Sequence, residues 1–222
     1  MARAEDTRAR IVHAAEEVVL RDGVARLTIE AAAAESAMSK GGILYHFPTR
    51  DSLVSAMVDR LASSFDSDLA RFLAEEASAE CGPVKERQAA SGSSTQSDAP
   101  SPAEASPRPG AFTRAYLRAT FAPGGDERDA RLGAAVIAGV AADPALLSVL
   151  RERFETWQRR IEKDGIPPAT ATLARLAADG LWLVELLRLA PPDAELRAMV
   201  GEELLGTTRI AAEADETEEA DR

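Results

Sequence analysis

The chain has 222 residues, 45% of them hydrophobic, which is enough to bury a core in one large domain or two small ones. Its 45 alanines and 5% aromatic residues favour helices over a β-sandwich or barrel. A single cysteine and two histidines exclude an internal disulfide framework and zinc sites built from four cysteines, from two cysteines with two histidines, or from three histidines. The formal net charge of −11 argues against coating of nucleic acid through bulk charge.

The distribution of charge along the chain is uneven. The first 60 residues carry a net charge of only −1, and residues 36–50 contain Lys40, His46 and Arg50 but no acid. The longest uncharged apolar run, 132–142, is too short to span a bilayer, and the start mixes acids with arginines, unlike a signal peptide. We therefore expect a cytoplasmic protein that makes no membrane contact, with one short N-terminal stretch suited to touching phosphate.

Four helices are predicted before residue 77. The first covers about 5–22 and stops at Gly23, and the second covers about 29–35 with Thr28 as its N-cap. After a break at 36–38, a short third helix begins behind a second N-cap, Ser39, and ends near residue 47. Pro48 forces a new start, where Thr49 or Asp51 serves as the cap. The fourth helix has an apolar stripe at every fourth position: Leu53, Met57, Leu61, Phe65, Leu69 and Leu73.

Residues 77–110 have a different composition, with seven Ser, seven Ala and five Pro but a single large aliphatic residue. Such a segment cannot offset its ordering entropy, so we expect a disordered insertion within one fold, or alternatively a linker between two independent domains. Five more helices are predicted near 111–122, 127–142, 144–163, 168–190 and 194–212. An acid-rich end, 213–222, is expected to be a frayed, solvated tail.

Residues 28–47 have the layout of a helix-turn-helix: a helix, a three-residue break, and a short helix that begins Ser-Lys-Gly-Gly. The capped start of that helix directs amide N–H groups outward, where a phosphate oxygen can accept them. Gly41 and Gly42 allow close approach to a groove, and Lys40 can reach a phosphate or a guanine edge. Tyr45 and His46, one turn later, can donate to the DNA backbone, although both could instead pack this helix on the first.

The segment 28–53, TIEAAAAESAMSKGGILYHFPTRDSL, resembles the DNA-binding domain of the tetracycline-repressor (TetR) family. The shared features are the Thr that opens the second helix, the Ser-Lys-Gly start of the recognition helix, its Tyr-His-Phe ending, and a basic residue followed by an acid and Leu. The resemblance implies phosphate or base contacts from Thr28, Ser39, Lys40, Gly41, Gly42, Tyr45, His46 and Arg50. The sequence departs from the family pattern at Ala37, where the turn usually has Gly, and also at Leu44 and Ala32.

The resemblance also implies an all-α fold with a three-helix DNA-binding domain over residues 1–50 and a helical effector-binding and dimerisation domain over 51–212. Its partners would be an operator duplex, a second copy of the chain and a small effector, which we expect to be apolar or aromatic. Large rings that could line the effector pocket are Phe65, Phe112, Tyr116, Phe154, Trp157 and Trp182. The 168–190 helix is apolar nearly all round at its end, which independently indicates an interface, and the expected contacts there are Leu183, Leu187, Leu196, Val200 and Leu204.

The sequence thus favours a homodimeric, ligand-released transcriptional repressor that is not an enzyme and needs no cofactor or metal. Two rival hypotheses remain: a helical enzyme or ligand-binding protein with a vestigial helix-turn-helix, and a DNA-binding adaptor that takes no ligand. His13 and Glu17 have the i, i+4 spacing of two metal ligands, but no motif supplies a third. The effector and the operator sequence are not encoded in any recognisable motif.

Overall fold

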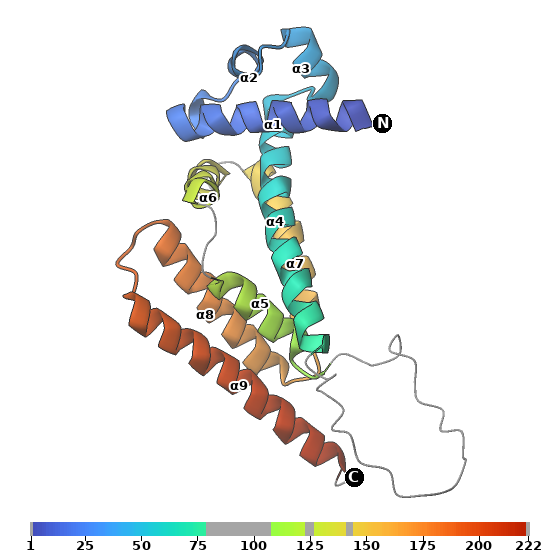
Figure 1. Cartoon of the computed structure of the whole chain (residues 1–222), viewed down its shortest axis with the longest axis vertical. Helices are drawn as coiled ribbons and strands as arrows, with labels where there is room; N and C mark the ends of the chain where they lie inside the picture. The colour runs from blue at the N-terminus through green and yellow to red at the C-terminus, as the bar shows by residue number, and fades with distance from the viewer. Residues whose placement is uncertain (1, 79–107, 123–126, 141–143, 221–222) are drawn as a thin grey trace, which may run out of the picture.

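A computed structural model describes residues 2–78, 108–122, 127–140 and 144–220 (Figure 1). Over these residues the fold is all-α, with nine α-helices, one 3-10 turn and no strand. In chain order the elements are α1 (Ala2–Asp22), η1 (Val24–Arg26), α2 (Ile29–Glu35), α3 (Lys40–His46), α4 (Arg50–Ser78), α5 (Ala111–Phe121), α6 (Glu127–Val140), α7 (Pro144–Ile161), α8 (Pro168–Leu186) and α9 (Ala194–Ala220). None of the described helices is both long and apolar enough to cross a membrane.

The first three helices and the start of α4 pack around one core at one end of the molecule (Figure 1). The local signals that place them act as predicted: Gly23 ends α1 with a φ of 83°, and the side chains of Thr28 and Ser39 accept hydrogen bonds from Ala31 N and Gly42 N. At the start of α4, Thr49 Oγ1 accepts a hydrogen bond from Ser52 N at 3.1 Å. These caps fix the chain direction at each helix start.

Helix α6 completes this N-terminal core although it lies about a hundred residues away in the sequence. Its Leu132 and Val136 are buried against α1 and α4, so the apolar core of the first three helices is not closed by the first 60 residues alone. At Gly139 the helix runs so close to η1 that an added Cβ would lie 2.7 Å from the Val24 side chain. This close approach leaves no room for a side chain, which explains why position 139 inside the helix is a glycine.

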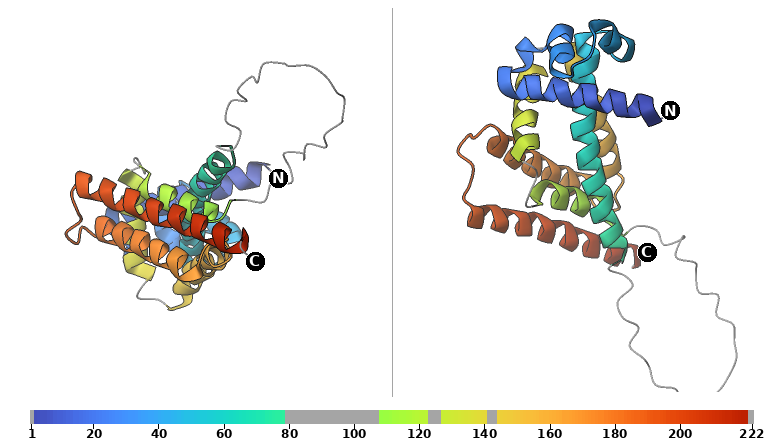
Figure 2. Two further views of the ribbon diagram at one scale, coloured as in Figure 1. Left: turned by 90° about the horizontal axis from the view of Figure 1, so that it is seen from below. Right: turned by 45° about the horizontal axis from the view of Figure 1, so that its top comes forward.

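The second core lies at the other end of α4. The rings of Phe65, Tyr116, Phe154 and Trp157 meet edge to face, with centroids 5.0–5.9 Å apart, between α4, α5 and α7. Helices α8 and α9 lie side by side against α5 (Figures 1 and 2). The long α4 therefore joins the two cores as a continuous rod.

Several predicted boundaries were wrong. The 168–190 helix ends at Leu186, because Arg188 and Ala190 adopt positive φ angles of 54° and 51° that break the helix. The expected frayed tail is helical to Ala220 and continues α9, consistent with the good helix propensity of its alanines and glutamates. The expected disorder of 77–110 does not hold at its margins: α4 runs to Ser78, and Gly110 is buried with its N–H bonded to Asp164 O. The rest of that expectation, 79–107, lies outside the described residues.

Candidate DNA-binding surface and effector groove

The second and third helices present a polar, partly aromatic surface at the end of the molecule. Ser39, Lys40 and Gly41 are exposed at the start of α3, and an added Cβ at Gly41 would meet no atom within 4 Å. Tyr45 is 84% exposed, and its ring meets the His46 ring edge to face, with centroids 5.1 Å apart. A side chain so exposed contributes little to the core, so the structure leaves the Tyr45 hydroxyl available to a partner.

Lys40 forms an ion pair with an acidic residue of the neighbouring helix. Its Nζ lies 2.6 Å from Oε1 of Glu30 on the first turn of α2, and both side chains remain about 60% exposed. The Lys40 ammonium lowers the pKa of Glu30 below its usual range. Lys40 thus stands beside a fully ionised carboxylate at neutral pH.

Arg50 was predicted to contact phosphate, but its guanidinium is largely directed inward. Nε donates to Leu27 O and Nη2 donates to Val24 O, both at 3.0 Å, while Nη1 pairs with Asp51. These bonds satisfy carbonyls around η1, the one element that was not predicted. A phosphate contact from Arg50 stays a prediction, since it would have to coexist with this internal role.

The turn between α2 and α3 contains the departure at Ala37. Its φ is 53°, in the left-handed region that glycine adopts without steric cost.

Sequence reasoning missed Arg8 of α1, whose guanidinium lies 4.3 Å from the centroid of the buried Phe47 ring and donates to His46 O. Arg8 therefore holds the C-terminal end of α3 against α1.

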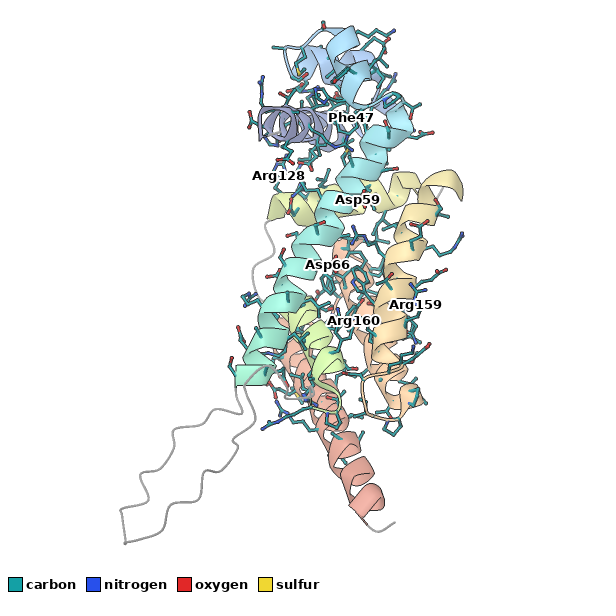
Figure 3. All side chains as sticks on the ribbon, turned by 90° about the vertical axis from the view of Figure 1, so that its right-hand side faces the viewer. Phe47, Asp59, Asp66, Arg128, Arg159 and Arg160 are labelled. Atoms are coloured by element: carbon teal, nitrogen blue, oxygen red, sulfur yellow. The ribbon has the colours of Figure 1, made fainter. Side chains whose placement is uncertain are left out.

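An ion cluster connects the N-terminal helices to the rest of the molecule. Glu16 of α1 is 1% exposed, and its carboxylate accepts hydrogen bonds from Arg60 of α4 and Arg128 of α6. Arg128 also donates to Glu17 at 2.7 Å and lowers the pKa of that carboxyl group. His13 Nδ1 lies 3.0 Å from Nη2 of the same guanidinium. Both members of the His13 and Glu17 pair, whose spacing suits metal ligands, therefore contact Arg128, which is labelled in Figure 3.

A groove of about 620 Å³ runs between α4 and α7, a size within the range of small-molecule sites. Figure 3 shows Asp66 of α4 and Arg160 of α7 at the space between these helices. Trp157 lines the groove and donates from Nε1 to Asp66 at 2.8 Å, while Arg153 pairs with Asp66 and Asp59. The groove is therefore aromatic and charged rather than purely apolar.

The other rings expected in a pocket are distributed differently. Phe65 and Tyr116 pack against Trp157 in the second core, and the Tyr116 hydroxyl donates to Asp179, whose pKa is raised by burial. Phe112 lies under the guanidinium of Arg160 at 3.9 Å. Phe154 lines a smaller hollow of about 300 Å³ with Arg151 and Arg175, whereas Trp182 lies apart on α8. The structure thus brings five of the six rings into one region and leaves Trp182 outside it.

Exposed large apolar side chains of the described residues occur on two surfaces only. Leu44 and Tyr45 lie on α3, and all the others lie on or between α8 and α9: Leu173, Leu176, Trp182, Leu183, Leu187, Leu189, Leu196, Met199 and Ile210. Of the expected interface residues, Val200 and Leu204 are half-buried within the single chain. An apolar surface of this extent is typical of a protein–protein interface. Leu173, Leu176, Met199 and Ile210 were not predicted, although their helical spacing along the two segments could have identified them.

Both halves of the chain match known families. Residues 11–57 match the family model described as bacterial regulatory proteins, tetR family, and residues 110–209 match the tetracyclin repressor-like C-terminal domain. The chain is 38% identical over 63 residues to the HTH-type transcriptional regulator TtgR of Pseudomonas putida. That match covers 28% of this chain and 30% of the relative, so it concerns one part of each protein.

Solved structures share the fold over nearly the whole chain. SCO7518 from Streptomyces coelicolor superposes with a TM-score of 0.62 at 19% identity, covering 91% of this chain and 98% of that one. The multidrug binding protein EbrR, crystallised with ethidium, superposes with a TM-score of 0.58 at 24% identity. That match covers 90% of this chain and 98% of the EbrR chain. At these identities the likeness establishes the helical architecture.

Proposed function

This chain belongs to the TetR family of transcriptional regulators, and on that premise we propose that it is a homodimeric repressor that a small molecule releases from a pseudo-palindromic operator. The proposal rests mainly on the exposed polar groups of the α2–α3 unit. The starts of α2 and α3 are both capped by side chains, and Tyr45 of α3 is 84% exposed among the described residues. Amide groups at helix starts, hydroxyls and one lysine are the groups that contact a DNA backbone and groove edge.

The operator should be tested by selection from random duplexes followed by fluorescence anisotropy. Tyr45→Phe keeps the ring contact with His46 and removes only the hydroxyl, so we expect a loss of affinity of about 1 kcal/mol, the usual net worth of one hydrogen bond. Lys40→Ala should reduce the slope of log K against log salt by about one charge per subunit if it contacts phosphate. Unchanged affinity and salt slope in both variants, with folding intact, would overturn α3 as the recognition helix.

The dimer is proposed to form through α8 and α9, where the exposed apolar side chains gather. Leu196 is 50% exposed in the single chain, so Leu196→Glu is tolerated by the monomer but places an unpaired charge in the proposed interface. We expect this variant to sediment as a monomer. Leu44→Glu is the matched control, because Leu44 is an exposed leucine on α3, far from this face, and its substitution should leave the dimer intact.

The effector is proposed to bind in the groove between α4 and α7, in contact with Trp157. An aromatic or apolar effector remains our expectation, and the paired carboxylates and guanidinium groups there favour one that also carries a polar or charged group. Since the chain has two tryptophans, Trp182→Phe leaves Trp157 as the single fluorophore. Ethidium and malachite green, found in EbrR crystals, are rational first probes.

Quenching of the Trp182→Phe protein, without quenching of the Trp157→Phe control, would locate a probe at the groove. Release of operator DNA by the same probe would distinguish a ligand-responsive repressor from a DNA-binding adaptor that takes no ligand. Probe binding without any operator binding would instead favour the ligand-binding protein with a vestigial helix-turn-helix.

A further inference from the structure

The recognition segment has very little positive charge of its own. Between Ile29 and His46 the sequence contains one lysine, Lys40, against two glutamates, Glu30 and Glu35. Glu35 is paired with Arg21 of α1 at 2.8 Å, on the side of α2 that faces α1. Glu30, by contrast, lies on the first turn of α2 and holds the single lysine of the segment at 2.6 Å.

This pairing places a carboxylate where DNA would approach. Thr28 and Ser39 cap the two helix starts, and Glu30 and Lys40 each lie within two residues of one of these caps. A phosphate that approaches Lys40 must either displace the Glu30 carboxylate or bind beside it. Displacement costs the ion pair between Lys40 and Glu30, and binding beside the carboxylate brings two anions into repulsion, so the net gain from the ammonium group is reduced in both cases.

We propose that Glu30 is a specificity-determining residue, which lowers affinity for DNA in general by competing with phosphate for Lys40. Sequence-independent binding depends on phosphate contacts, so it is the part of the affinity that the carboxylate weakens most. A cognate site can offer Lys40 the acceptor atoms of a guanine edge and further contacts to Tyr45 and Ser39, which offset the loss of the pair. Discrimination against other sequences is thereby achieved through repulsion as well as attraction.

This inference rests on the proposed function, because it assumes that α3 contacts DNA. It adds that the carboxylate opposes non-cognate binding and does not merely stabilise the fold. An exposed ion pair of this kind contributes little to stability, so the pair can be removed without loss of the domain.

The test compares Glu30→Gln with the wild-type dimer on a random-sequence duplex and on a selected operator. We expect Glu30→Gln to bind the random duplex about fivefold more tightly per subunit, the size of one interaction between unit charges in water. On the random duplex, the dependence of log K on log salt should become steeper by about one charge per subunit. The preference of the variant for the operator over the random duplex should fall.

Glu35→Gln is the matched control. It removes the same charge from the same helix but leaves the Lys40 pair intact, so its affinity for random duplex should stay near the wild-type value. In the Lys40→Ala background the gain from Glu30→Gln should shrink, because the freed ammonium group is missing. Circular dichroism and thermal melting of each variant verify that α2 remains folded.

Equal gains from Glu30→Gln and Glu35→Gln would overturn the inference, since bulk charge alone would then account for the effect. Unchanged or weaker binding of random duplex by a folded Glu30→Gln protein would overturn it as well. A wild-type protein that binds neither duplex would refute the proposed DNA-binding function itself, and that result is distinguishable from the other two.

Discussion

The cluster around Glu16 predicts that α6 is energetically coupled to α1, and Arg128→Met tests this directly. The substitution keeps the aliphatic stem of Arg128 but removes the guanidinium that bonds to Glu16 at 3.2 Å and to Glu17 at 2.7 Å. Breaking a buried ion pair typically costs about 3–5 kcal/mol. Here Arg60 still neutralises Glu16, and the Arg128 side chain is 28% exposed. We therefore expect a loss of about 2 kcal/mol, the worth of hydrogen bonds to a charged group.

The assay is urea unfolding followed by circular dichroism at one fixed protein concentration, because dimer formation would make stability depend on concentration. Arg131→Met is the control: it lies on the same helix, is exposed, and should change stability by less than about 0.5 kcal/mol. In the Glu16→Gln background, the cost of Arg128→Met should fall by about 1 kcal/mol, as expected for side chains in one network.

Equal stability of the Arg128→Met and Arg131→Met proteins would refute the coupling of α6 to α1 through this cluster. Additive losses in the double variant would show that Arg128 acts through some contact other than Glu16. A larger urea m value would indicate a change in the exposed surface, and would require a different explanation.

Three further predictions concern the packing of the N-terminal helices. Arg50→Met should lower stability by about 1–3 kcal/mol, because the carbonyls of Val24 and Leu27 lose charge-assisted donors, and thermal melting measures the loss. Gly139→Ala should be destabilising by about 1–3 kcal/mol through overpacking against Val24, and a smaller residue at position 24 should reduce that cost in the double variant. Ala37→Gly should raise stability by up to about 1 kcal/mol, since φ is 53° there, and no gain would show that chain entropy outweighs the relief of strain.

The helix-turn-helix was predictable from sequence because its signals are local. Thr28 and Ser39 cap the next turn of their own helices, and Gly23 ends α1 within a few residues, so neighbouring positions carry the information. The third helix was placed over residues that the structure confirms to within one position. The strain at Ala37 was also foreseeable, since a turn that usually has glycine implies a left-handed backbone.

The parts that sequence did not predict depend on distant contacts. Helix α6 was predicted as a helix, but nothing local shows that Leu132 and Val136 fill the core beneath α1. The inward orientation of Arg50 depends on η1, whose carbonyls were not expected to need a donor. Likewise, apolar spacing alone cannot show that Trp157, which is buried in the second core, also lines the groove, whereas its neighbour Phe65 does not.

The weak positive charge of the recognition segment gives the proposed dimer a particular importance. With Lys40 paired to Glu30, each α3 offers little free positive charge to phosphate, so we expect a single half-site to be bound weakly. Two helices joined through α8 and α9 convert the second binding event into an intramolecular one, which can raise overall affinity by about 10²–10⁴ without a new contact. Leu196→Glu, which leaves α3 untouched, should therefore reduce operator binding by a factor in this range. If the monomeric protein bound the operator as tightly as the dimer, the affinity would have to come from contacts outside the α2–α3 surface.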